Sequence, residues 1–379
     1  MSHGNEKLQN YFSYANTTGH GIIGKHNLSK HNLTFRETSV LLNSRLKLDG
    51  SMNLMRQVVK NKPTVGGFYM NPLVGLYRFP RGEDIAYYKE NFEVYDEGRN
   101  LNIQNWHTSY EDFEQNPYWI TNRILSKENR MHVIVSLSAN LKINDWLSLQ
   151  ARGNVDYIND KVRQQFYAST APALAGANGR YIEMDYQETQ YYGDAILMMK
   201  KQWDAFSLNA ALGVSINDKT VNSTRYDSKT ASLKYANVFN LANIIMNGSA
   251  GLDQKIDARR QLQSLFATAQ LGYNEFVYLD LSARNDWSST LAYTSHEKSG
   301  FFYPSVGFSL IFNKLMTLPQ WVSLAKIRGA YSMVGNDIPM FITNPSSHIT
   351  AGGEFLASDA APFKDMEPEM THSFEAGIE

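Results

Sequence analysis

The sequence has no cysteine, no surplus of either charge and no long apolar segment. The absence of cysteine rules out a disulfide framework and a thiolate metal site, and it fits export through an oxidising compartment. The 36 basic and 37 acidic side chains nearly cancel, so nothing indicates a nucleic-acid partner. No apolar run approaches the roughly 18 residues of a transmembrane helix, which excludes a helical membrane protein but leaves a spanning β-barrel open.

The sequence does contain strict alternation of apolar and polar residues, and the stretch NEFVYLDLSARNDWSST (274–290) displays it best. With a period of two, Val277, Leu279 and Leu281 point to one side. Asp280 and Arg284 point to the other. If such a strand spans a membrane, its leucines face lipid and its charged side chains face a wet lumen.

Similar strands recur in pairs that are joined by short turns, as expected for β-hairpins. The predicted pairs are 133–141 with 147–156, 190–200 with 206–216, 264–273 with 277–284, and 303–312 with 324–333. Two earlier segments, 8–15 and 44–55, have a weaker strand pattern.

Long polar segments separate these hairpins, so short and long connections alternate. The long ones are predicted to be irregular, at 57–130, 159–189, 217–260, 286–301 and 334–370. Strands of about 9 to 11 residues suit a tilted crossing of a bilayer. Compact soluble domains have a median loop of about 4 to 6 residues, so they seldom show this asymmetry.

Tryptophan placement points the same way. Trp146, Trp203 and Trp321 lie in or beside short connections, where an aromatic girdle would occupy one membrane interface. A soluble β-sandwich also has alternating strands and polar loops, and it stays the alternative. We therefore predict an all-β fold, an antiparallel transmembrane β-barrel that is incomplete in this chain, with about twelve strands, short periplasmic turns and long extracellular loops.

Motifs that would indicate an enzyme are weak. The segment GHGIIG (19–24) has the letters of a dinucleotide fingerprint, but polar and strand-like residues follow it, so a turn is predicted. His20, His26 and His31 have spacings that suit neither one helix face nor one strand face. No G-x-S-x-G motif occurs. We expect no enzyme activity and no catalytic, cofactor-binding or metal-binding residue.

Several segments together resemble the SusC/RagA family of TonB-dependent outer-membrane transporters. They are GIIGKHNLSKHNLTFR, NPYW, NDWLSLQARGNVDY, LDLSARNDWSST, FFYPSVGFSLIFN, KIRGAYSMVGND and MEPEMTHSFEAGIE. Two positions depart from the family pattern. Trp287 stands where the family commonly has glycine, and Glu367 stands where it usually has lysine.

The resemblance implies that the chain is one part of a larger receptor. Residues 1–379 would form a partial barrel domain, without the export signal, the plug and the TonB-contacting segment of the family, whose barrels have about 22 strands. The start MSHGNEKLQN has no apolar h-region, in keeping with this.

The resemblance also implies a function: import of a bulky nutrient, an oligosaccharide or a peptide, across the outer membrane of a Gram-negative bacterium. A SusD-like surface lipoprotein and TonB would be the protein partners, and the barrel would contact outer-membrane lipid. Outer-loop aromatics would be candidates for substrate binding, namely Trp106, Tyr110, Tyr118 and Trp119. Their alternative role is to pack the loop. A barrel enzyme with a serine–histidine–acid site and a soluble carbohydrate-binding or adhesive domain stay as rival functions.

Overall fold

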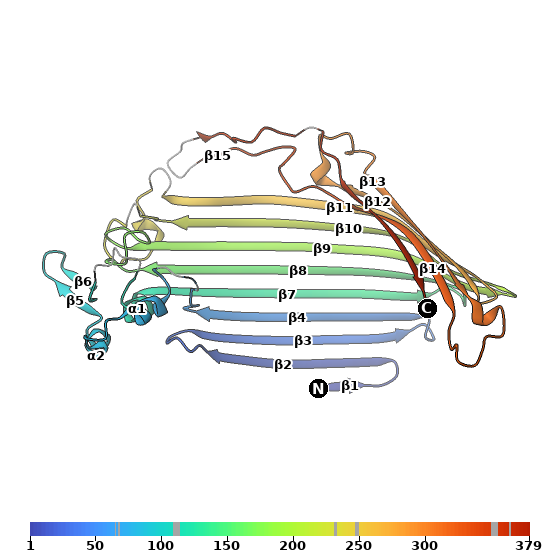
Figure 1. Cartoon of the computed structure of the whole chain (residues 1–379), viewed down its shortest axis with the longest axis horizontal. Coiled ribbons are helices and arrows are strands. Elements are labelled where there is room, and N and C mark those ends of the chain that lie inside the picture. The colour runs from blue at the N-terminus through green and yellow to red at the C-terminus, as the bar shows by residue number, and fades with distance from the viewer. Residues whose placement is uncertain are drawn as a thin grey trace.

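The computed structural model describes residues 1–64, 66, 69–108, 114–230, 233–246, 250–349, 355–363 and 365–379. Its main feature is one antiparallel meander, in which each strand pairs with the strand before it (Figure 1). The strands of this sheet are β1 (Ser2–Gly4), β2 (Leu8–His20), β3 (Asn27–Leu41), β4 (Leu46–Lys60), β7 (Ile124–Lys142), β8 (Leu147–Phe166), β9 (Arg180–Trp203), β10 (Phe206–Asp227), β11 (Gly251–Tyr273), β12 (Val277–Ser288), β13 (Phe301–Ile311), β14 (Lys326–Asn336) and β17 (Glu369–Ile378). The predicted all-β antiparallel architecture is confirmed, with twelve long strands and the short β1.

The remaining elements are short and lie in the connections. They are α1 (Pro72–Arg78), α2 (Ile85–Glu90), β5 (Glu93–Asp96), β6 (Leu101–Gln104), α3 (Pro117–Arg123), η1 (Leu241–Asn243), η2 (Ser289–Leu291), η3 (Phe312–Lys314), β15 (His348–Ile349) and β16 (Phe355–Leu356). Each α-helix begins after a side chain that accepts a hydrogen bond from the first turn, namely Asn71, Asp84 and Asn116. None of the described helices is long and apolar enough to cross a membrane.

The predicted asymmetry of the connections is confirmed. At one end of the sheet lie 5–7, 42–45, 143–146, 204–205, 274–276 and 312–325, of which the last is long. At the other lie 21–26, 61–123, 167–179, 228–250, 289–300 and 337–368, of which the first is short. The tight turn after β11 uses left-handed backbone at Asn274 (φ 46°) and Glu275 (φ 58°), which suits a two-stranded hairpin with right-handed twist. The segment 19–24 leads from β2 into β3, so no helix follows it.

The predicted strand length is wrong for most of the sheet. The strands from β12 onward have 10 to 12 residues, as expected, but those from β2 to β11 have 13 to 24. Two segments predicted to be irregular, 159–189 and 217–260, are largely strand. In the first, β8 runs to Phe166 and β9 starts at Arg180. In the second, β10 runs to Asp227, which pairs with Gly251 at the start of β11. On the convex face these strand ends are mainly polar, and on the concave face apolar residues such as Phe166, Ile182 and Val221 lie among polar ones. The pattern of a lipid-facing strand therefore stops there, whereas the backbone ladder continues because it needs no apolar side chain.

The two faces of the sheet have the reverse of the burial found in soluble proteins. Apolar side chains on one face are exposed, for example Leu137 (64%) and Leu212 (54%). Polar side chains on the other face are buried, for example Asp194 (7%), Ser264 (5%) and Asp286 (4%). Side chains converge on the hollow side of a curved sheet and splay on the outer side, so the polar face is the concave one and the apolar face the convex one.

Candidate functional site

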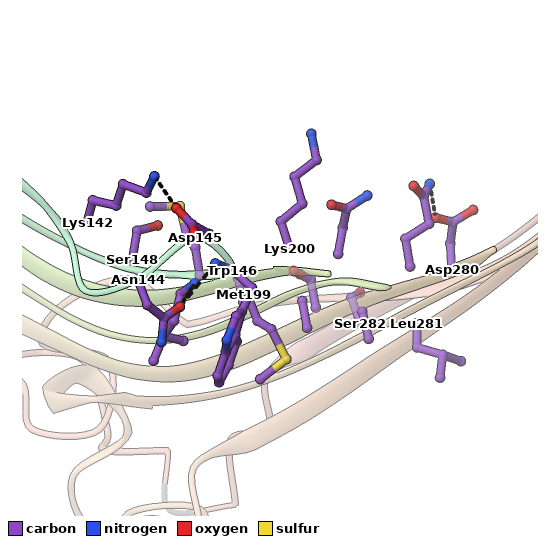
Figure 2. Close-up of a pocket in the computed structure, with 18 of the residues that line it drawn as sticks. Lys142, Asn144, Asp145, Trp146, Ser148, Met199, Lys200, Asp280, Leu281 and Ser282 are labelled. Carbon is purple, nitrogen blue, oxygen red and sulfur yellow. Dashed lines mark hydrogen bonds and ion pairs between the residues drawn. The ribbon is translucent and has the colours of Figure 1, made fainter. Parts of the chain in front are cut away.

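The concave face carries the candidate functional surface. At the end with the short turns, Lys200 and Asp280 project to one side of the ribbon, whereas Trp146, Met199 and Leu281 project to the other (Figure 2). The sequence prediction that Asp280 and Leu281 lie on opposite faces is therefore confirmed. Trp146 and Trp203 lie at this short-connection end, as predicted, and the Nζ of Lys201 lies 5.4 Å from the Trp146 ring centroid.

The register shows what lines the concave face. One row of directly paired residues crosses the sheet from β8 to β17, and most of its members are small and polar. The row consists of Ser148, Met198, Ala211, Thr268, Ser282, Ser305, Ser332 and Ser373. Hydroxyl groups on this row keep access to water and to each other, as in the 2.6 Å contact between Ser282 Oγ and Ser305 Oγ. Such a surface stays hydrated, and it gives other parts of the protein no apolar face to pack against.

Further toward the long loops, a buried carboxylate organises the concave face. Asp286 accepts hydrogen bonds from Arg284 Nε (2.8 Å) and from the hydroxyl of Tyr303 (2.7 Å). The Arg284 guanidinium also donates to Ser264 Oγ at 2.8 Å and lies 5.5 Å from the Phe266 ring centroid. We call Ser264, Arg284, Asp286 and Tyr303 the Asp286 cluster. It ties β11, β12 and β13 together on their concave side.

A second carboxylate joins the β14–β17 connection to the same rim. Asp337 accepts hydrogen bonds from Arg260 Nε (3.0 Å) and Thr290 Oγ1 (3.0 Å), and Ser288 Oγ also donates to it. The next residue, Ile338, is buried in a small apolar cluster. The quoted segments LDLSARNDWSST, FFYPSVGFSLIFN and KIRGAYSMVGND thus meet through these two carboxylates. The sequence patterns pointed to these segments, but no local signal showed that their polar side chains would converge.

Trp287, which departs from the family pattern, has a local role. Its Nε1 donates to the carbonyl oxygen of Lys298 at 3.1 Å, so it holds the β12–β13 connection against the strand end. A glycine at this position could not make that bond.

The aromatic residues proposed for substrate binding lie in the connection between β4 and β7. Trp119 is 1% exposed, and its Nε1 donates to Thr170 Oγ1 at 3.1 Å. Its indole therefore packs the loop and has no free surface in this arrangement. Tyr118 is half-buried in the same short helix α3, and Tyr110 lies outside the described residues. The substrate-binding role of all four aromatics stays a prediction.

Trp106 belongs to an aromatic group in this loop. Its ring centroid lies 5.2 Å from that of Phe79 and 5.3 Å from that of Tyr88, and its Nε1 donates to Glu114 Oε1 at 3.2 Å. His107 contacts the same carboxylate at 3.2 Å. Among the described residues, Trp106 and Trp119 thus make separate side-chain contacts.

A buried ion network secures the long-loop ends of β9 and β10. Asp227 is 1% exposed and accepts from Arg180 (2.8 and 2.7 Å), Arg225 (3.0 Å) and the Lys229 amide (2.8 Å). Burial opposes ionisation of this carboxyl, but the hydrogen bonds from Arg180, the Lys229 amide and Arg225 outweigh it and lower the pKa of Asp227 below its usual value of 3.8.

This network predicts acid sensitivity of the neighbouring loop. Because the folded-state pKa of Asp227 is lowered, its stabilising contribution is complete above pH 3.8 and is lost as the pH falls through the lower folded-state value. We expect hydrogen exchange at residues 233–246, corrected for intrinsic rates, to be equally slow at pH 7 and pH 5 and faster at pH 3. The Asp227→Asn variant should exchange fast at all three pH values. Equal protection of both proteins at pH 7 would contradict this role.

The described residues offer little for catalysis or metal binding. No group of three or more His, Cys, Asp or Glu side chains among them is placed to hold a metal ion. His132 Nε2 lies 2.7 Å from Asp156 Oδ1, yet within the described part of the chain no serine hydroxyl bonds to this imidazole. What the arrangement offers is a hydrated wall with cross-strand ion pairs, which can line a path for polar solutes.

Comparisons with known proteins agree with this architecture. The family described as "TonB dependent receptor-like, beta-barrel" matches residues 68–379. The chain therefore belongs to the TonB-dependent receptor β-barrel family. No curated protein sequence matches it.

Solved structures share the fold at low sequence identity. The RagAB peptide transporter is 18% identical with a TM-score of 0.72, over 100% of this chain and 41% of that one. The pyoverdine-bound FpvA of P. aeruginosa is 13% identical with a TM-score of 0.57, over 98% of this chain and 42% of that one. The ferric-catecholate import receptor Fiu of E. coli is 11% identical with a TM-score of 0.53, over 99% of this chain and 52% of that one. The chain spans about two fifths to one half of the length of these structures.

Proposed function

We propose that this chain forms part of the wall of a TonB-dependent receptor in the outer membrane of a Gram-negative bacterium. The observation that carries the proposal is the reversed burial of the sheet, with exposed leucines on the convex face and buried carboxylates on the concave face. In water this arrangement would leave a large apolar surface uncovered. In a bilayer the same surface is covered by lipid, while the concave face lines a hydrated lumen.

The height of the apolar band supports this placement. On β10 the convex face is apolar from Phe206 to Ile216 and turns polar at Asp218. With a rise of about 3.3 Å per residue and a tilt of about 40°, this stretch spans roughly 25 Å, the height of the apolar band of outer-membrane barrels. Aromatic side chains lie near both edges of the band, including Trp203 and Phe206 at one edge and Tyr191 at the other.

The upper edge of the apolar band also indicates which part of the sheet would lie outside the membrane. Beyond Asp218, strands β8 to β11 continue with mainly polar side chains on the convex face, among them the cross-strand pair of Arg259 and Asp218. We infer that the sheet and the long connections extend into the external medium, whereas the short turns lie at the periplasmic side. This part of the wall is tall enough to surround a bulky solute before it enters the lumen.

The transported substrate is proposed to be a bulky nutrient, a peptide or an oligosaccharide. The likeness to the RagAB peptide transporter favours a peptide, and the hydroxyl-rich concave face suits either solute. A SusD-like lipoprotein is the proposed partner at the long loops. TonB is proposed to act through a plug that a larger polypeptide contributes, because this chain spans about two fifths of the RagAB structure that it matches.

Uptake by intact cells tests this proposal. Cells that carry the intact receptor should accumulate fluorescent peptides or oligosaccharides of a size that general porins exclude. Uptake should be lost when the gene is deleted or when the proton-motive force is dissipated, because TonB-dependent transport draws on that force. Uptake that persists after both treatments would contradict the proposal, and a preference between the two probes would identify the substrate class.

A further inference from the structure

Three cations stand side by side on the convex face. Lys60 of β4 pairs directly with Lys127 of β7, and Lys127 pairs directly with Arg163 of β8. All three side chains are exposed. Directly opposed residues on one face have Cβ atoms only about 4.5 to 5.5 Å apart, and like charges in such positions destabilise a sheet.

Several other cations on the convex face have acidic neighbours, although Arg56, Lys201 and Lys255 form no ion pair within the described ranges. Arg259 contacts Asp218 at 2.5 Å, and Lys161 contacts Asp185 at 3.4 Å. Arg163 itself contacts Glu183 at 3.1 Å on its far side. Across the described ranges of the chain, however, no carboxylate lies within ion-pair distance of Lys60 or Lys127. Lys60, Lys127 and Arg163 therefore place three cations in directly paired positions, and of these Arg163 alone has an ion-pair partner among the described residues.

The three cations lie a short distance above the apolar band. On β7 the band ends near Met131, and Lys127 lies four residues further along the strand. On β8 the band ends near Tyr157, and Arg163 lies six residues further. These separations correspond to about 10 to 15 Å along the membrane normal, just above a headgroup layer that is about 5 to 7 Å thick on each side. Long lysine and arginine side chains can bend down to that layer.

We propose that Lys60, Lys127 and Arg163 bind phosphate groups of an anionic lipid in the leaflet on the long-loop side. Phosphate oxygens would offset the repulsion between the opposed lysines and accept charge-assisted hydrogen bonds from all three side chains. A lipid headgroup is the proposed ligand, because the cations lie on the convex face just above the expected headgroup layer and not inside the lumen or at the loop tips. The inference rests on the membrane placement proposed above.

Lipid retention by the reconstituted receptor tests this site. The intact receptor would be inserted into phosphatidylcholine nanodiscs with and without lipid A, a phosphorylated glycolipid, and the lipid A retained after washing would be measured by mass spectrometry. The Lys60→Gln, Lys127→Gln double variant should retain lipid A at least about tenfold less strongly than the wild type, since each lysine near an anionic surface strengthens binding severalfold. A control variant with Lys47→Gln and Lys298→Gln removes one exposed lysine of the concave face and one of the β12–β13 connection, and it should retain lipid A like the wild type.

The outcomes separate the two proposals. Equal retention by the wild type and the Lys60/Lys127 variant, or an equal loss in the control variant, would overturn the lipid site alone. Displacement of lipid A by millimolar inorganic phosphate would show an ion site in place of a lipid site and would also overturn it. Failure of the wild type to insert into plain phosphatidylcholine bilayers would overturn the membrane placement, and the lipid site with it.

Discussion

Leu281→Arg is expected to abolish most insertion of the intact receptor into bilayers. Leu281 lies on the convex face of β12, 40% exposed, between other apolar positions of the band. An arginine near the bilayer midplane of a barrel costs roughly 2 to 4 kcal/mol. The folded fraction, measured by heat-modifiable mobility after refolding into lipid vesicles, should fall further as the hydrocarbon thickness increases, because a thicker bilayer leaves the guanidinium less able to reach water.

The neighbouring residue supplies the matched control. Ser282→Arg places the same group on the concave face, where Ser282 contacts Ser305 and where water persists. Its folded fraction should stay close to that of the wild type, while uptake of the transported solute should fall because the guanidinium obstructs the path. If Leu281→Arg loses no more folding than Ser282→Arg, or if its loss does not depend on bilayer thickness, the convex face does not contact lipid.

Asp286→Ala is expected to destabilise the concave face strongly. It removes the carboxylate that accepts from both Arg284 and Tyr303 and leaves the guanidinium beside a phenol with no balancing charge. Removing one partner of a buried ion pair costs about 3 to 5 kcal/mol. The Arg284 side chain is 34% exposed, so water can solvate the unpaired guanidinium and reduce this cost. We therefore expect the free energy of unfolding of the intact receptor in urea to fall by about 2 kcal/mol.

A surface ion pair provides the comparison for this prediction. Asp185→Ala removes a carboxylate whose side chain is 53% exposed and which lies 3.4 Å from Lys161, so its cost should stay below about 1 kcal/mol. A double-mutant cycle between Asp286→Ala and Arg284→Gln should show coupling, because the two side chains bond directly. Additive effects of the two changes would contradict the cluster as an energetic unit.

The sequence predicted the fold class because alternation and loop asymmetry are both local signals. The opposite orientation of Leu281 and Asp280 follows from a period of two and is confirmed on β12. The tight turn at Asn274 was likewise readable, since short polar segments between alternating strands form hairpins. The first strand, β1, was not predicted, because its three residues are too short to give any periodic signal.

The strand ends and the polar clusters could not be read in the same way. The outer halves of β9 and β10 have no apolar row on the convex face, so no lipid-facing pattern marks them as strands although their backbones pair as far as Asp227. The Asp286 and Asp337 contacts join residues that are far apart in sequence, such as Arg260 and Asp337, and only the register of the sheet brings them together. The loop aromatics were predicted as binding residues from their chemistry, but burial decides which of them a ligand can reach.

Cysteine accessibility along β10 tests the central claim most directly. The chain has no native cysteine, so single substitutions from Ser207 to Ile216 give a background-free scan in an intact receptor whose remaining part has had any cysteine replaced. We predict that a water-soluble maleimide labels cysteines at the concave positions 207, 209, 211 and 215, whereas the convex positions 208, 210, 212, 214 and 216 stay unlabelled in bilayers. Gly213 is left unchanged, because a Cβ there would lie 2.3 Å from the Phe266 ring. A lipid-soluble quencher should show the opposite pattern with a fluorophore at the same positions. Labelling without alternation, or with the phase reversed, would contradict the claim that this sheet separates lipid from a hydrated lumen.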